Sequence, residues 1–580
     1  MITTDLPTIH LTEVEGIRTV WSELPGPLRC GLGLRVGSSD ETLPTCGITH
    51  MMEHLAFFGI GRPGDHSNGY VDQTVTMFHC EGDAPFATGF LDSVTRQLVN
   101  PPLHRLDDER EILRAEYAGK GYSPQRRLLI WRYGAAGYGL SGFDGMGLHG
   151  LTPDLLTTWS RRYATRQNAV LWFSGPPPAG MRINLPDGVS VPPIDPLPGI
   201  VPKFPAYIGG PSDVVAVQAL LPRNAAAQAL GSVMEARLVD ELRTRRAAAY
   251  SPQVDVSALT GETSELIVLS DLVAGRQSDA VRPLLATLHH LAGEEEQETT
   301  ADEVDTWRAD ALRQASDPAT ALSWPVSQAL RVLHGGDVTH PGEWAEQITA
   351  VTPDDVTQAA VAALSTALAQ VPTRVRVSRS SWVRAPGTLL EPVEGTTYDR
   401  RDPEETSNRL IMGEDGISWV GEDTTHTTVT RSSAAGVLVW PDGKRVVVGA
   451  DANTVEVEPN LWKHGRQIVD QIDHLWSGPL VIPMPPRNPG EIPAPPAPVA
   501  GGEDDGPGAT GPTGEERIPG GRGRAASTIS RWVNGLCLAV SFGIGTQCLS
   551  QGWRHQDLRF AFVGLIFCSL SSWCWKRFRS

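Results

Sequence analysis

Apolar and polar positions alternate through residues 8–36, which is the period of a half-buried β-strand. The clearest stretches are Ile17–Trp21 and residues 28–32, and the segment as a whole predicts a hairpin. A helical period follows at residues 84–99 and 109–116, and residues 153–173 have the pattern of a helix followed by a strand.

After a proline-rich connector at residues 186–205, the same plan is repeated. The pattern predicts a strand, a helix, a second strand and a second helix, at residues 214–220, 225–245, 265–272 and 279–293. The chain is therefore expected to have an α+β fold with two similar halves, residues 1–200 and 201–400.

Residues 401–480 are expected to form a third, small, β-rich domain. Short strand-like runs separated by turns occur at residues 416–419, 427–431, 436–439, 445–448 and 454–457. A helical pattern follows at residues 461–475. Several short strands with one terminal helix resemble a pleckstrin-homology-like (PH-like) barrel, and a generic β-rich appendage is the alternative.

The C-terminal part changes character twice. Residues 481–525 are dominated by Pro, Gly and acidic residues, so we expect a disordered linker there. Residues 526–580 contain two apolar stretches, 532–550 and 560–575, with Trp residues near their ends. They predict a two-helix membrane hairpin, and an interfacial helix pair or an oligomerisation hairpin is the alternative.

Charge and cysteine usage suggest where the body of the protein lies. Arg531 precedes the first apolar stretch and Lys576 follows the second, which favours both flanks on the cytoplasmic side. The N-terminal residues lack the signal-peptide pattern, and seven cysteines without a C-x-x-C motif indicate reduced thiols. We therefore expect a cell-membrane protein with two spans and a cytoplasmic body. The net charge of −18 argues against a nucleic-acid partner.

The candidate chemistry begins with His50, Glu53 and His54, which form an H-x-x-E-H pattern. Positions i, i+3 and i+4 share one helix face, so two imidazoles and a carboxylate point at one small volume. Zinc hydrolases need such ligands, a third ligand from elsewhere and an open position for water. The alternative is a histidine pair on an amphipathic helix above the apolar run 55–58.

A second acidic pattern lies at residues 109–116. Glu109 and Glu116 are seven residues apart, so both carboxylates can face the same way while Ile112 and Leu113 pack behind them. The neighbouring acids Asp107, Asp108 and Glu111 have a simpler explanation, as a solvated first helical turn that matches the helix dipole.

Further motifs surround these two patterns. Gly37-Ser38-x-Asp40-Glu41 precedes H-x-x-E-H, and Asn68-Gly69-Tyr70 follows it before a strand-like run at residues 74–78. The later motifs are Arg237-Leu238-x-x-Glu241-Leu242-Arg243, Ala249-Tyr250-Ser251 and Val351-Thr352-Pro353. Over residues 8–370 these motifs and their order resemble the pitrilysin/insulinase (M16, inverzincin) family of zinc peptidases, closest to its processing-peptidase branch.

The resemblance implies a catalytic first half and an inactive second half that closes the cleft. It implies that His50, His54 and Glu116 bind Zn²⁺ and that Glu53 is the general base. Glu109 would orient a ligand.

The same resemblance implies that Arg243 and Tyr250 reach over from the second half to hold the peptide and stabilise the oxyanion. Asn68 would bind the substrate backbone. An exposed helix surface, with Arg243 paired to Asp240, is the alternative for Arg243.

Two departures from the family pattern concern the cleft. Gly69 replaces the usual Ala and Val71 the usual Thr, and the segment between His54 and Asn68 is short and loop-like. Neither removes a ligand. We expect a membrane-tethered zinc endopeptidase acting on peptides, as a homodimer or paired with a related subunit. The alternative is a non-catalytic or partner-dependent scaffold subunit of a peptidase complex.

Overall fold

The computed structural model describes most of the chain up to residue 495. The described residues are 7–60, 66–196, 199–294, 299–377, 381–401, 408–421 and 425–495. Within these ranges, no helix is both long and apolar enough to cross a bilayer. The predicted hairpin at 526–580 and most of the predicted linker lie outside the described residues and stay predictions.

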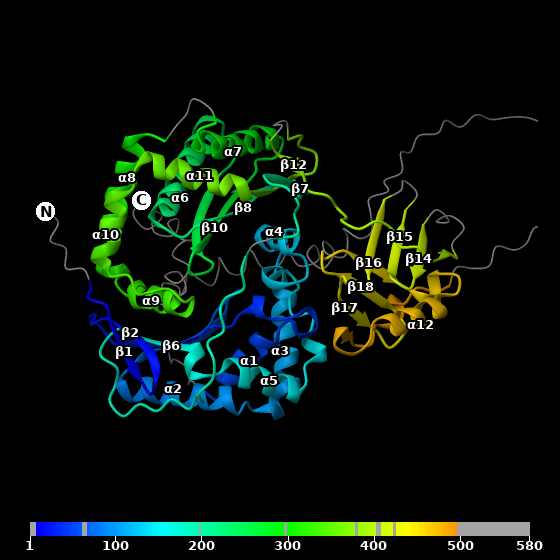
Figure 1. Ribbon diagram of the computed structural model, residues 1–580, viewed down its shortest axis with the longest axis horizontal. Coiled ribbons are helices and arrows are strands. Elements are labelled where there is room, and N and C mark those ends of the chain that lie inside the picture. The colour runs from blue at the N-terminus through cyan, green and yellow to red at the C-terminus, as the bar shows by residue number, and fades with distance from the viewer. Residues whose placement is uncertain are drawn as a thin grey trace, which may run out of the picture.

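The first half, coloured blue to cyan in Figure 1, is built on a six-stranded sheet with the order β1-β2-β6-β3-β5-β4. Its strands are β1 (His10–Val14), β2 (Ile17–Trp21), β3 (Leu28–Leu34), β4 (His66–Val71), β5 (Thr76–Gly82) and β6 (Ala169–Phe173). Its helices are α1 (Ile48–Phe57), α2 (Ala84–Val99), α3 (Leu106–Gly119), α4 (Pro124–Tyr133) and α5 (Pro153–Tyr163).

The hairpin predicted within residues 8–36 is confirmed as β1 and β2, but residues 17–21 and 28–32 are not neighbours in the sheet. β2 pairs with β1, and β6 lies between β2 and β3, parallel to the former and antiparallel to the latter. All five residues of β6 are buried. The apolar strand that completes the sheet therefore comes from more than a hundred residues away, which a local pattern cannot show.

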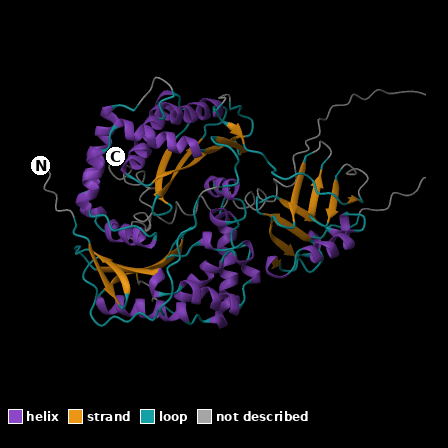
Figure 2. Ribbon diagram, in the orientation of Figure 1, coloured by secondary structure: helices purple, strands orange, loops and turns teal. Residues whose placement is uncertain are grey.

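The second half repeats this plan, as expected. Its sheet has the order β12-β7-β11-β8-β10-β9, with β7 parallel to β11 and the next three pairings antiparallel. The strands are β7 (Ala206–Gly210), β8 (Val214–Pro222), β9 (Gln253–Ala258), β10 (Thr263–Asp271), β11 (Leu368–Pro372) and β12 (Val383–Arg384). The mixed α+β fold with two similar halves is confirmed (Figure 2).

The helices of the second half are α6 (Ala225–Leu238), α7 (Gln277–Leu291), α8 (Ala301–Ala315), α9 (Ser323–Leu333), α10 (Pro341–Ala350) and α11 (Pro353–Thr366). The helix predicted at 225–245 changes type, because residues Val239–Arg245 form a π-helical turn. This wider turn keeps Leu238 and Leu242 buried in the same core.

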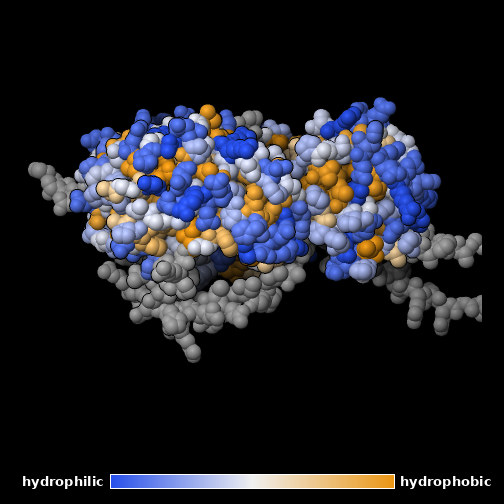
Figure 3. Space-filling view, turned by 90° about the horizontal axis from the view of Figure 1, so that it is seen from below, coloured by the Kyte–Doolittle hydropathy of each residue, from blue (hydrophilic) through white to orange (hydrophobic). Residues whose placement is uncertain are grey.

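Residues beyond the second half form a third domain with two four-stranded sheets. The strands are β13 (Thr396–Asp399), β14 (Arg409–Gly413), β15 (Gly416–Val420), β16 (His426–Thr430), β17 (Ala434–Val439), β18 (Arg445–Gly449), β19 (Thr454–Val457) and β20 (Val481–Pro483). α12 (Gly465–Leu475) closes their shared core. Figure 3 shows this domain as a lobe beside the two halves. Its PH-like character stays a prediction.

The two halves exchange helices across their boundary. α9 of the second half packs Trp324, Val326 and Val332 against Trp172 and Met77 of the first sheet. In return, α4 of the first half packs on β8 and β11 of the second sheet through apolar residues that include Leu128. Each sheet is therefore covered on one face by a helix of the other half.

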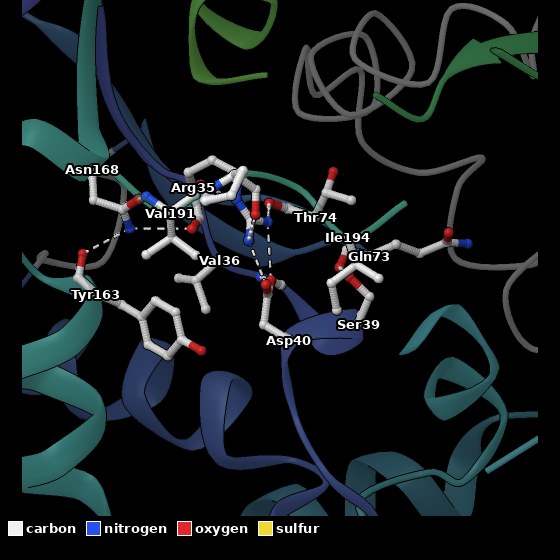
Figure 4. A network of polar contacts seen from close by, with 12 residues as sticks. Arg35, Val36, Ser39, Asp40, Gln73, Thr74, Tyr163, Asn168, Val191 and Ile194 are labelled. Carbon is white, nitrogen blue, oxygen red and sulfur yellow. Dashed lines mark hydrogen bonds and ion pairs between the residues drawn. The ribbon is translucent and has the colours of Figure 1, made fainter. Parts of the chain in front are cut away.

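A buried guanidinium organises the loop in front of α1 (Figure 4). Arg35 is 1% exposed and forms a two-bonded ion pair with Asp40. Its remaining N–H groups donate to the carbonyls of Thr74, Val191 and Pro192, at 2.7, 2.9 and 3.2 Å. One side chain thus ties β3, the loop before β5 and the connector to the segment that leads into α1.

Arg35→Met should destabilise the protein by about 3–5 kcal/mol, because it leaves Asp40 buried without its counter-charge. Arg96→Met is the matched control, since Arg96 forms an exposed i,i+4 pair with Asp92 on α2. We expect less than about 1 kcal/mol there. Denaturant unfolding of both variants makes the measurement, and equal losses would contradict the role assigned to Arg35.

Candidate metal centre

α1 carries the H-x-x-E-H residues and owes its orientation to its apolar face. Met51, Met52 and Leu55 are fully buried in the core of the first half. His50 and His54 therefore lie on the opposite side, toward α3. The local sequence thus fixes both the helix and the side on which the imidazoles appear.

The start of α1 is held by the partly buried Glu41, the last residue of the Gly37–Glu41 motif, to which the sequence assigned no role. Gly47 precedes the helix with φ = 99°, a conformation that favours glycine. The carboxylate of Glu41 accepts the N–H groups of Gly47 and Thr49, at 2.8 and 2.9 Å. Burial raises the pKa of Glu41 to about 7, although both backbone bonds oppose that shift. The cap satisfies two helix-end donors that would otherwise lack a partner.

α3 brings the second pair of carboxylates to the same place, as predicted. Glu109 and Leu113 are buried while Glu116 is half-exposed. The expected packing of Ile112 is wrong, because this side chain is 48% exposed. α3 covers the core with Leu106 and Leu113, and Ile112 falls outside that narrow stripe.

The distances among these groups suit a tetrahedral cation. Glu116 Oε2 lies 3.6 Å from Nε2 of His50 and 3.6 Å from Nε2 of His54. Ligand atoms of tetrahedral zinc lie about 3.3–3.4 Å apart, since the metal–ligand bonds are about 2.0–2.1 Å long. Glu53 Oε2 is slightly farther, 3.7 and 3.9 Å from the same nitrogens. Two imidazoles and a carboxylate are also the chemical set that zinc accepts.

Both imidazoles are oriented through their second nitrogen. His54 Nδ1 lies 3.2 Å from Glu109 Oε2, and His50 Nδ1 lies 3.0 Å from the hydroxyl of Tyr117. Arg105 in turn donates to Glu109 at 3.3 Å. Such partners fix the ring so that Nε2 faces the metal position. Tyr117 and Arg105 were missed in the sequence, although Tyr117 directly follows the predicted ligand Glu116.

Burial shifts the protonation of this cluster. Desolvation lowers the pKa of His50 to about 4, which keeps its imidazole neutral and available as a ligand. Desolvation, and then the charges of Glu116 and Glu109, raise the pKa of Glu53 to about 8. Glu53 is therefore the carboxylate whose affinity for protons suits proton transfer near neutral pH, while Glu116 suits ligation.

Gly69 is fitted to Glu53. A Cβ atom on Gly69 would lie 2.5 Å from Glu53 Oε1 and 2.5 Å from Phe57 Cε2. Gly69 belongs to β4, the edge strand beside α1, and is next to the exposed Asn68. The departure from the usual Ala therefore leaves room for the carboxylate between the strand and the helix.

Arg243 and Tyr250 lie in the second half, apart from the polar contacts of this cluster. The guanidinium of Arg243 stacks over the ring of Tyr250 at 5.4 Å, and Tyr250 is 57% exposed. The expected alternative pairing with Asp240 is wrong, since Asp240 pairs with Arg245 at 2.8 Å. Among the described residues, neither side chain has an ion pair or hydrogen bond to the His50–His54 cluster.

Comparison with known proteins adds the family context. No family model matches the chain. Over 194 residues it is 26% identical to coenzyme PQQ synthesis protein F of Pseudomonas protegens. That match covers 29% of this chain and 23% of the other protein, so it reaches less than a quarter of the relative's length.

Solved structures share the fold at low identity. A protease from Helicobacter pylori aligns with a TM-score of 0.52 at 17% identity, over 63% of this chain and all of that one. A peptidase M16 inactive domain from Pseudomonas fluorescens gives 0.52 at 16% identity, over 64% and 99%. The first half of the periplasmic protease PqqL from Escherichia coli gives 0.50 at 14%, over 64% and 93%.

Glu41→Ala should cost about 1–3 kcal/mol of stability, because two helix-end donors lose their acceptor. It should also weaken Zn²⁺ binding, since the helix that carries both imidazoles loses its anchor. Asp83→Ala is the matched control, because Asp83 caps α2 by accepting from Phe86 N–H at 2.8 Å. The control should lose stability and keep its Zn²⁺ affinity in a dye competition. Equal Zn²⁺ affinities in both variants would refute the anchoring role.

Proposed function

The chain has the fold and the ordered motifs of the M16 peptidase family, and on this premise we propose that it is a zinc-dependent endopeptidase. The observation that carries the proposal is the position of Glu116 Oε2, equally distant from the two imidazole nitrogens of α1. Two helices far apart in sequence thus supply a complete ligand set, with a buried carboxyl group beside it.

His50, His54 and Glu116 would hold the zinc ion, which supplies an acidified water when it is bound. Glu53 accepts the proton of the attacking water and passes it to the leaving amine. The carboxylate of Glu109 and the hydroxyl of Tyr117 hold the two imidazoles in the orientation that leaves Nε2 free. Glu53 is buried where α1 faces Gly69, and the raised pKa of its carboxyl group suits both the uptake of a proton from water and its release to the amine.

We place the substrate along β4. β4 is the edge strand of the first sheet and lies beside α1. One side of β4 pairs with β5, which leaves its other side open within the sheet. An extended peptide can add to such an edge through backbone hydrogen bonds. Asn68 is exposed on this strand and would bind the peptide backbone, which brings the scissile bond past Glu53.

Arg243 and Tyr250 would act from the second half. Both are donors that suit a developing oxyanion, and the stacking of the guanidinium on the Tyr250 ring holds the pair together. The π-helical turn at Val239–Arg245 follows α6 and contains Arg243, and such turns occur frequently at functional sites.

The second candidate is a non-catalytic or partner-dependent scaffold subunit. The solved inactive domain shows that this fold also occurs without activity, so fold by itself does not separate the two functions. The ligand set favours the peptidase, because a scaffold has no need of two oriented imidazoles and a carboxyl group with a raised pKa.

The purified protein should contain about one zinc per chain, and a chelator should abolish peptide cleavage. His54→Ala and Glu116→Ala should lose the metal, whereas Glu53→Gln should keep it and lose turnover. Glu111→Ala is the matched control, because Glu111 lies exposed on α3 and pairs with Arg114, away from the His50–His54 cluster. Metal analysis measures the zinc content of each variant, and a peptide assay measures its turnover. A Glu116→Ala variant with full zinc would exclude Glu116 as the third ligand.

Tyr250→Phe should lower kcat by about a hundredfold to a thousandfold with little change in zinc content, since its hydroxyl would act on the oxyanion. Tyr207→Phe on β7 serves as the control for loss of a tyrosine hydroxyl. If Tyr250→Phe and Arg243→Ala both keep parental kinetics, the two residues are surface residues without a catalytic role.

A further inference from the structure

The third domain packs against the loop that leads into the metal-binding helix α1. A buried cluster joins it to the first half. The cluster consists of Leu43, Ala135 and Leu140 from the first half and Leu438, Trp440, Val448 and Ile482 from the third domain. Figure 1 shows β17 and β18 on the side of the domain that faces the first half.

Leu43 is the centre of this contact. It is 1% exposed and belongs to a short 3₁₀ turn, Leu43–Thr45, between Glu41 and the start of α1. Gly436 of β17 approaches it so closely that a Cβ there would lie 3.2 Å from Leu43 Cδ2 and 3.0 Å from Ile482 Cδ1. The third domain therefore closes over the loop that leads into α1.

Backbone contacts fix the same junction. The N–H of Ala135 donates to the carbonyl of Ala450 at 2.9 Å, which joins the end of α4 to the loop after β18. Gly150 of the first half lies against Pro483 of β20, where a Cβ would come within 3.3 Å of the ring. The junction thus combines buried apolar packing with a directed hydrogen bond, which fixes the register of the two surfaces.

The contact continues to the metal ligands through one short segment. Leu43 is two residues from Glu41, whose carboxylate caps α1, and α1 carries His50 and His54. The N–H of Gly147 donates to the carbonyl of Cys46 at 3.1 Å and closes the loop from its other side. Any displacement of Leu43 therefore acts on the cap of the helix.

We infer that the third domain is a positioning element of the metal centre, because its β17–β18 face holds the Leu43 loop that fixes α1. The domain acts through Leu43 and Glu41 and touches no metal ligand among the described residues. The inference rests on the proposed function only in taking zinc as the ion that His50 and His54 bind.

The strands of the third domain offer matched pairs of variants for a test in the full chain. Val448 faces the junction, while its neighbour Val447 faces the domain's own core, and they are 1% and 0% exposed. Val448→Ala and Val447→Ala remove the same two methyl groups from adjacent positions. Leu438→Ala and Val437→Ala form a second pair on β17, in which the junction variant loses one carbon atom more than the core variant.

The junction variants Val448→Ala and Leu438→Ala should weaken Zn²⁺ binding by about tenfold, the range expected when a support of metal ligands is disturbed. They should also speed hydrogen exchange at the amides of Gly47 and Thr49. The core variants Val447→Ala and Val437→Ala should lower the unfolding midpoint yet keep both readouts within about twofold of the parent.

The two readouts separate failure of this inference from failure of the proposed function. A parent protein without Zn²⁺ affinity would overturn the proposed function, and hydrogen exchange at Gly47 and Thr49 would still test the junction. Equal exchange in junction and core variants would overturn the inference, whatever the metal result. Equal Zn²⁺ affinities in a metal-binding parent and its junction variants would overturn it as well.

Discussion

A buried guanidinium needs hydrogen-bond acceptors within the protein, and those of Arg35 lie on the segments around α1. Its ion pair with Asp40 anchors the loop at residues 37–47, and three carbonyls complete its bonds. Glu41 then caps α1 from that loop, and Leu43 receives the third domain. The orientation of the helix that carries both imidazoles therefore depends on this set of buried contacts.

Much of the candidate site could be predicted because the positions of its residues follow from helical periodicity. His50, Glu53 and His54 share one face of α1, and Glu109 and Glu116 share one face of α3, so local spacing was sufficient. The same reasoning is wrong for Ile112. The pattern predicts that this side chain packs behind the carboxylates, whereas it lies on the exposed side of α3. Periodicity gives the direction of a side chain, whereas the width of the buried stripe depends on the neighbouring elements.

The remaining features depend on contacts between distant segments. β6 enters the first sheet between β2 and β3, and no pattern near residues 17–34 announces it. Glu109, the partner of His54, was expected to orient a ligand, whereas Tyr117, the partner of His50, becomes apparent only when α3 is laid against α1. The packing of Leu43 against β17 likewise joins residues almost four hundred positions apart. The α+β plan was predictable, while the pairings that hold the site in place were not.

The exchange of α4 and α9 has a consequence for the way the two halves can move. Each sheet has one face that is covered by a helix of the other half, α9 on the first sheet and α4 on the second. Swinging the halves apart would expose Trp324 and Trp172 to water and strip Arg132 from its partners Gln218 and Thr366. Opening of the two halves about the connector at residues 186–205 is therefore opposed by buried contacts on both sheets.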